Sequence, residues 1–211
     1  MFVKMELVRK QSDLDDQEFR RKWEEEGKNA KVKTPALRQY HQNFITDRKQ
    51  LGIDYARGDL DFAGIGEHWF DSLSEAPTIL GSPSVTALQN IVIPEPIDMP
   101  FVKRMSTLKR RTDVSAERFK TEWFELHATL VKRIPGVMGY TQNLIIARSR
   151  ADGTPASYEE LPIDGFVELW FEDKAGLDAA FATGQAKTLM THALEFIDEI
   201  STFLVEPIEI N

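Results

Sequence analysis

The first half of the chain alternates between strand-like and helix-like patterns of apolar and polar residues. Residues 2–10 alternate with a period of two, which is typical of a strand. From about residue 15, apolar positions recur at helical spacing within a strongly charged segment, and we expect Phe19, Trp23, Ala30 and Val32 to face inward. Residues 72–89 hold only one or two short helical turns, since prolines and glycines interrupt them. Further strands are predicted at residues 37–47, 62–71 and 90–97.

The second half repeats this order. A helix begins at Ser115, and Pro135 and Gly136 end it. Residues 174–200 are predicted to be helical, with an interruption near Gly184. The first of these helices has its apolar positions spaced to form one stripe: Phe119, Trp123, Leu126, Leu130 and Ile134. Strands are predicted at residues 101–111, 137–148, 164–173 and 201–210.

The two halves also share residues in one register. A repeat of this length indicates a duplicated small domain. We therefore expect two domains, residues 1–100 and residues 101–211. Seven residues of the first half recur unchanged one hundred positions later: Phe19, Trp23, Glu25, Pro35, Tyr40, Gln42 and Asn43. In the third strand, Gly64, Glu67, Trp69 and Phe70 recur as Gly165, Glu168, Trp170 and Phe171.

Each predicted half has the order β-α-β-β-α-β, which is that of a ferredoxin-like unit. Its two helices cover one face of the sheet, so the bare face has to pack on another sheet. Two such units in one chain can supply this partner to each other. The sequence therefore predicts an α+β protein in which two ferredoxin-like repeats form an intramolecular dimeric α+β barrel. Free sheet edges leave room for a homodimer as well.

Composition narrows the function. A net charge of −8 and a pI near 5.1 argue against nucleic acid and against an anionic membrane as partners. Cysteine is absent, which excludes disulfides and thiolate chemistry. No metal-ligand or nucleotide-binding motif is present, so we expect neither a metal nor another cofactor. The N-terminus does not resemble a signal peptide and no run of eighteen apolar residues exists, so we expect a cytoplasmic protein.

The repeated residues resemble the EthD family of dimeric α+β barrel proteins. The first half keeps the fold residues but has Gly27 where the second half has His127. The resemblance implies the barrel fold. Members and relatives include proteins of ether and aromatic degradation, cofactor-free decarboxylases, cyclases and monooxygenases of aromatic polyketides, and distant barrels that hold haem. The second half carries the whole pattern: Phe119, Trp123, His127, Pro135, Gly136, Tyr140, Gln142, Asn143, Asp164, Gly165, Glu168, Trp170 and Phe171.

His127 and Glu168 are the candidate catalytic residues. His127 follows Trp123 at i+4 and borders the buried face of its helix, where a neutral imidazole can act as a general acid or base near pH 7. A structural histidine that bonds a carbonyl is the alternative. Glu168 is either a buried carboxylate with a raised pKa and a catalytic role, or part of a structural ion pair of the kind that the matching Glu67 would share. Because Gly27 replaces the histidine, we expect one functional pocket per chain.

Residues that recur in both halves are weaker candidates for chemistry, because a structural role explains the recurrence equally well. Tyr140 and Asn143 lie on opposite faces of their strand, so both can line one pocket only across a bulge. His41 and His68 belong to the first half alone and could build a pocket there, and His192 is expected to be a surface or rim residue. The candidates for substrate binding are Trp123, Tyr140, Gln142, Asn143 and Trp170.

Two classes of function remain open. The first is a cofactor-independent lyase, cyclase or dehydratase of a small aromatic or polyketide-like compound, with His127 as the acid/base and Glu168 or a tyrosine assisting. The second is a non-catalytic barrel that binds a hydrophobic ligand or assembles with other chains. A cofactor-free monooxygenase is a third, weaker option. The enzyme hypothesis requires a cavity of about a few hundred Å³ that touches His127.

Overall fold

The computed structural model describes residues 1–211, and its eight strands close into one antiparallel barrel. Around the barrel the strands follow the order β1-β3-β2-β8-β5-β7-β6-β4. The first half contributes the four neighbours β4-β1-β3-β2, and the second half contributes β8-β5-β7-β6. The strands are β1 (Phe2–Val8), β2 (Gln39–Asp47), β3 (Gly64–Phe70), β4 (Ser84–Ile93), β5 (Val102–Arg110), β6 (Gly139–Ser149), β7 (Gly165–Phe171) and β8 (Ile197–Glu209).

The two four-stranded sheets are joined at both edges, where β2 pairs with β8 and β4 pairs with β6. The largest buried apolar cluster draws on both halves and includes Val3, Met5, Met105 and Phe203. The predicted intramolecular α+β barrel of two ferredoxin-like units is therefore confirmed. Closure pairs every strand on both sides, so the free edges that we expected to offer a contact between chains are already occupied.

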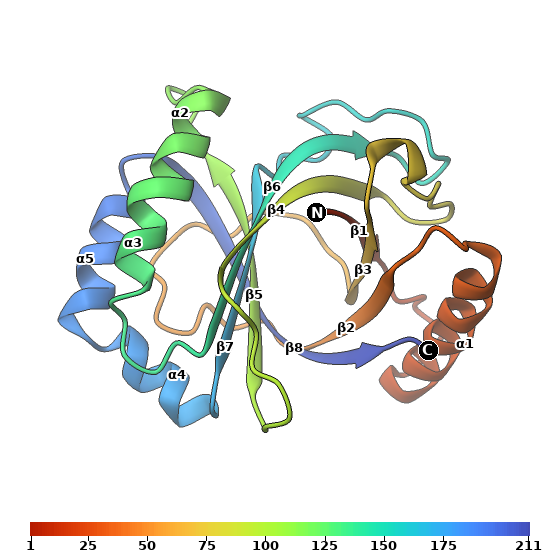
Figure 1. The fold of residues 1–211 in the computed structure, drawn as a ribbon, viewed down its shortest axis with the longest axis horizontal. Coiled ribbons are helices and arrows are strands. Elements are labelled where there is room, and N and C mark those ends of the chain that lie inside the picture. The colour runs from red at the N-terminus through yellow and green to blue at the C-terminus, as the bar shows by residue number, and fades with distance from the viewer.

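The helices lie outside the barrel and are divided unequally between the halves, with α1 on one side and α2 to α5 on the other (Figure 1). The second helix predicted for the first half is reduced to one 3-10 turn, because Pro77 and Pro83 interrupt the segment that follows. None of the helices has the length and apolar character needed to cross a membrane. The helical segments are α1 (Asp16–Lys33), the 3-10 turn η1 (Leu73–Glu75), α2 (Ala116–Thr121), the π-helix η2 (Glu122–His127), α3 (Ala128–Val131), α4 (Lys174–Phe181) and α5 (Gly184–Ala193).

Some predicted boundaries and orientations are wrong. β4 begins at Ser84 rather than at residue 90, and β8 begins at Ile197 rather than at residue 201. Ala30 is exposed and Val32 is 84% exposed, because the buried row of α1 ends at Gly27. Leu126 is 50% exposed, because it lies within the π turn, whose wider spacing changes which residues face the sheet.

Two glycines let the helices approach the sheet closely. A Cβ at Gly64 would lie 2.3 Å from the indole of Trp23, and a Cβ at Gly165 would lie 2.4 Å from the indole of Trp123. Both tryptophans are almost fully buried. The paired Trp and Gly of each half are therefore one packing contact, repeated.

A glutamine fixes each helix to the sheet below it. Gln142 donates from Nε2 to the carbonyl of Trp123 at 2.6 Å and to the hydroxyl of Tyr140 at 2.8 Å. In the first half, Gln42 makes the same two bonds at 2.7 and 3.0 Å. We call this arrangement the Trp–Gln–Tyr frame, and it gives the recurring tyrosine and glutamine a structural role.

Candidate functional site

The sheet divides the predicted site residues into two groups. Along β6 and β7, Tyr140 and Gln142 face the helices, whereas Asn143 and Glu168 face the barrel interior. Asn143 donates to Oε1 of Glu168 at 2.5 Å. His127 belongs to the helix side, so the sheet stands between it and Glu168. The expectation that Glu168 assists His127 is therefore wrong.

His127 is the last residue of the π-helix η2 and is 7% exposed. π turns within helices often occur at functional sites. The ring meets Phe196 edge-on, with 5.5 Å between the ring centres. Burial, and then the neighbouring His192, lower the pKa of His127 to about 3. The imidazole is therefore neutral at physiological pH and can accept a proton.

A chain of hydrogen bonds orients the His127 ring. Nδ1 of His127 lies 3.3 Å from Nδ1 of His192, and Nε2 of His192 lies 3.3 Å from Oε2 of Glu122. In the tautomer in which His192 donates from Nε2 to the Glu122 carboxylate, its Nδ1 atom accepts. His127 then donates from Nδ1 and keeps a lone pair on Nε2. His192 is 8% exposed, so the prediction of a surface or rim residue is wrong.

Arg104 on β5 is a buried cation without a carboxylate partner. It is 1% exposed, and Nη2 donates to Oγ1 of Thr202 at 3.1 Å. Its Nε and Nη1 atoms are buried and have no hydrogen-bond partner. The guanidinium stacks on the ring of Phe181 at 4.2 Å. Burial lowers the pKa of Arg104 to about 9, so the group is charged at neutral pH and its free donors suit an anion.

Arg104 and His127 line one cavity between the helices and the sheet, together with Tyr140 and apolar side chains. Its volume is about 40 Å³, which is room for one or two water molecules. The requirement of a few hundred Å³ at His127 is therefore not met by the closed packing, because Phe181, Leu189 and Met190 fill the space. Trp123 and Gln142 are buried beside this cavity without lining it.

The barrel interior holds a second polar centre. Nζ of Lys103 lies 2.8 Å from Oε2 of Glu67 and 2.7 Å from Oε2 of Glu168. Burial and then Glu67 raise the pKa of Glu168 to about 7, against the opposing effects of Lys103 and Asn143. Burial lowers the pKa of Lys103, but the two carboxylates outweigh it and raise that pKa above its ordinary value. One ammonium thus serves a glutamate from each half.

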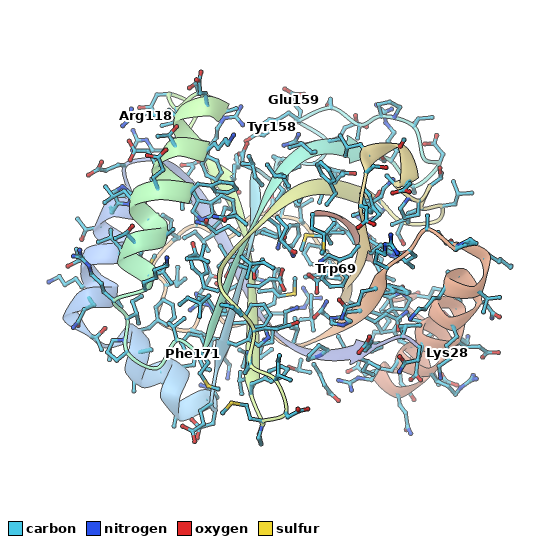
Figure 2. All side chains as sticks on the ribbon, viewed as in Figure 1. Lys28, Trp69, Arg118, Tyr158, Glu159 and Phe171 are labelled. Carbon is cyan, nitrogen blue, oxygen red and sulfur yellow. The ribbon has the colours of Figure 1, made fainter.

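A cavity of about 290 Å³ opens at one end of the barrel, above this centre. Its walls include Trp69 and Trp170, and Glu168 lies at its base. Figure 2 shows side chains filling the ring of strands, with Trp69 among them. His41 also faces this side, edge-on to Trp69 at 4.9 Å, and burial followed by Lys103 lowers the pKa of His41 to about 4. His68, by contrast, faces α1, so the two histidines of the first half do not share a site.

Three residues of these centres were missed from the sequence: Lys103, Arg104 and His192. The comparison of the halves carries a signal for two of them. Lys103 stands where the first half has Val3, which places a charge at an interior position. Arg104 stands where the first half has Lys4, so a cation recurs on the helix side. No group of three or more His, Cys, Asp or Glu side chains is arranged to hold a metal ion.

Comparisons with known proteins agree with this architecture. A family model described as the EthD domain matches residues 11–91 and 111–200, one segment in each half. Among curated proteins, none matches this chain.

Solved structures extend the likeness over the whole chain. Two are proteins named putative monooxygenases. The one from Lactobacillus acidophilus NCFM has 12% identity and a TM-score of 0.55, and the match covers 98% of this chain and 92% of that chain. The one from Fusobacterium nucleatum has 9% identity and a TM-score of 0.57, with 100% and 93% covered. An anthrone oxidase-like protein has 8% identity and a TM-score of 0.52, with 100% and 93% covered. At these identities the likeness shows the fold alone.

Proposed function

The chain belongs to the EthD family, and we propose that it is an enzyme that removes a proton from a small aromatic or polyketide-like compound at His127. The single observation that carries this proposal is the placement of two unsatisfied groups in one cavity. His127 has one ring nitrogen, Nε2, outside its contact with His192, and Arg104 has free donors and no counter-ion. Together they suit a substrate that becomes, or already is, an oxygen anion.

The proton-transfer step follows from the chemistry of these two groups. Nε2 of His127 accepts a proton from an acidic C–H or O–H group, and the guanidinium of Arg104 stabilises the negative oxygen that forms. A bound anion also favours the protonated imidazole, which offsets the burial that lowers the pKa of His127. His192 and Glu122 hold the ring in place while its charge changes.

The fate of the anion separates the two enzyme classes. In a lyase, cyclase or dehydratase, the imidazolium returns the proton to a leaving group or to the product. In a monooxygenase, the anion reacts with dioxygen instead: one oxygen atom replaces the two hydrogens of the reacting carbon as a carbonyl, and the other oxygen leaves with them as water. The relatives named monooxygenases support the second class only through their shared fold. Product analysis with and without dioxygen distinguishes the two.

A non-catalytic barrel is the second candidate function, and the small cavity favours it. About 40 Å³ does not admit an aromatic ring, so catalysis requires Phe181 and the side chains of α5 to move apart when substrate enters. Under the non-catalytic reading, Arg104 and His127 hold only water. The catalytic and the non-catalytic proposals share the same fold. They differ in whether a substrate or only water enters the cavity.

The test combines turnover and binding. Small phenolic and polyketide-like aromatic compounds are incubated with the protein, and the His127→Ala variant is expected to lose about 10²–10⁴-fold in turnover. Thr129→Ala, an exposed change on α3 that does not line the cavity, is the control and is expected to retain full turnover. A His127→Ala protein that works as well as the parent contradicts the proposal. Absence of turnover in the parent, with no saturable binding of benzoate at Arg104, supports the non-catalytic reading.

A further inference from the structure

The first half contains a larger cavity at the place that corresponds to the His127 cavity. It lies between α1 and the outer face of the sheet and has a volume of about 210 Å³, compared with about 40 Å³ in the second half. A cavity of roughly 150 Å³ is large enough to hold benzene. The first-half cavity therefore admits a small aromatic ring without rearrangement.

Two differences between the halves shape this cavity. Residues 77–80 form a loop along its edge, where the second half carries helices α4 and α5. Gly27 also lines the cavity and lets α1 lie close to Gln42 and Tyr40, since a Cβ there would be 2.5 Å from Nε2 of Gln42. Leu80, at the loop, is 68% exposed, so the cavity reaches solvent on this side.

The cavity holds a histidine and a glutamate that have no counterparts in the second half. His68 is 6% exposed, and its Nε2 atom is buried without a hydrogen bond. That atom lies 3.5 Å from Oε2 of Glu6. The ring of His68 stacks on Tyr40 with 4.0 Å between the centres. A polar group inserted here finds an acceptor and an aromatic wall already in place.

Gly66 allows Glu6 and His68 to lie this close together. A Cβ at Gly66 would lie 3.0 Å from Oε2 of Glu6 and 3.3 Å from Nε2 of His68. The second half has Ser106, Val167 and Leu169 at the three equivalent positions, so none of the group recurs there. The arrangement is specific to the first half and is not part of the Trp–Gln–Tyr frame.

The charges around the cavity favour a cation. Glu6 and Glu26 both line it, and no lysine or arginine does. The nearest lysine on the same strand, Lys4, donates to the carbonyl of Pro77 at 2.8 Å. Burial, and then Glu6, raise the pKa of Tyr40, so its hydroxyl stays neutral. Carboxylates beside aromatic rings are suited to a protonated amine.

We propose that the first half binds a small aromatic amine between α1 and the sheet, with the ring in the cavity and the ammonium group at Glu6, Glu26 and His68. This site is separate from the His127 cavity and prefers the opposite charge. A single chain thus carries two ligand sites of different chemistry on one barrel. The proposal does not depend on turnover at His127.

The test uses the four histidines as reporters, since each of the two cavities contains its own. The full chain is labelled with ¹⁵N-histidine and titrated with benzylamine, and separately with benzoate, near neutral pH. Benzylamine is expected to shift the His68 ring signals saturably and to leave those of His127 and His192 unchanged. A His68 signal that does not respond to benzylamine at millimolar concentration, or that responds equally to benzoate, overturns the proposal.

Two variants separate binding from folding. Glu6→Ser introduces the residue of the second half and is expected to weaken benzylamine binding by about tenfold or more, because it removes the nearest charged partner. Ala30→Phe changes an exposed residue at the rim and is expected to block the cavity. Unchanged His127 and His192 signals show that each variant is folded. Benzylamine binding of parental strength in both folded variants overturns the site.

Discussion

The two halves build the same Trp–Gln–Tyr frame and then use the space above it differently. In the first half, a regular helix passes over the frame with Gly27 at the closest point, and a cavity of about 210 Å³ remains. In the second half, the helix forms a π turn that brings His127 over the frame, and about 40 Å³ remains. The frame has a structural role in both halves, so functional residues are expected at the positions where the halves differ.

In the barrel interior, by contrast, the two halves do not build separate sites. Equivalent glutamates from both halves share one ammonium group. Glu67 and Glu168 are equivalent, and each accepts from an asparagine of its own half. The single ammonium between them comes from Lys103, where the first half has Val3. The interior therefore depends on an asymmetry between otherwise matching halves.

Removing Lys103 is expected to have the largest effect on stability. Lys103→Met leaves two buried carboxylates without their cation, which costs about 3–5 kcal/mol of unfolding free energy near pH 8. The loss is expected to shrink toward pH 5, because protonation of Glu168, whose pKa is raised, removes part of the unpaired charge. Urea unfolding at the two pH values measures both effects.

The matched control replaces the carboxylates as well. Lys103→Met combined with Glu67→Gln and Glu168→Gln removes every charge of the centre and is expected to recover much of the lost stability. A single Lys103→Met variant that loses less than about 1 kcal/mol at pH 8 contradicts the shared ion pair.

The second prediction concerns the loss of folding stability at low pH. It tests the second half alone, because only that half carries His127. The pKa of His127 is lowered to about 3 in the folded protein, so between that value and about 6.5 the unfolded chain binds more protons. Stability is thus lost as the pH falls below 6.5. His127→Gln removes this loss and is expected to save up to about 3 kcal/mol between pH 7 and pH 4.

The difference between parent and variant isolates His127. Glu168, whose pKa is raised, acts with the opposite sign, but it is present in both proteins and cancels. His41, whose pKa is lowered to about 4, provides a matched variant at the barrel mouth, and His41→Gln is expected to act in the same direction with a smaller effect. Equal acid sensitivity of parent and His127→Gln would show that the imidazole is not held neutral.

Much of the fold could be predicted from the sequence, because the duplication preserves rare residues in register. Trp23 and Trp123, with the glycines beneath them, mark the same helix–sheet contact twice. Two four-stranded sheets with bare apolar faces then leave the barrel as the arrangement that buries both.

The candidate site was less predictable for three physical reasons. A π turn alters the hydrogen bonding of one short segment, so the apolar spacing around His127 and Leu126 hardly reveals it. Arg104 lies on a strand with polar residues on both faces, so the pattern does not show which face is buried, and helices cover the face of Arg104. The approach of His192 to His127 joins residues far apart in the chain, and no local pattern encodes it.

Gly27 tests whether the first half can take a side chain where the second has one. A Cβ at this position would lie 2.5 Å from Nε2 of Gln42 and 3.0 Å from Tyr40. Gly27→Ala is therefore expected to lose about 1–2 kcal/mol, since overpacking outweighs the better helix propensity of alanine. Thermal and urea unfolding measure the change.

Gly184 provides the control for this substitution. It begins α5, and a Cβ there would meet nothing within 4 Å, so Gly184→Ala is expected to be neutral or to stabilise by about 0.5 kcal/mol. A stabilising Gly27→Ala would mean that the frame has room for a side chain without a π turn. The absence of a histidine in the first half would then need another explanation.

The smallest expected effect is also the one with opposite signs in the two halves. Arg104 is buried without a counter-ion, so Arg104→Met is expected to leave the stability of the ligand-free protein unchanged or to raise it by about 1 kcal/mol. The equivalent change Lys4→Met removes the hydrogen bond to Pro77 and is expected to lower stability by about 1 kcal/mol. Urea midpoints of the two variants, measured side by side, give the comparison. A clear loss of stability in Arg104→Met would mean that the folded protein already satisfies the guanidinium, and the need for an anionic ligand at that position would disappear.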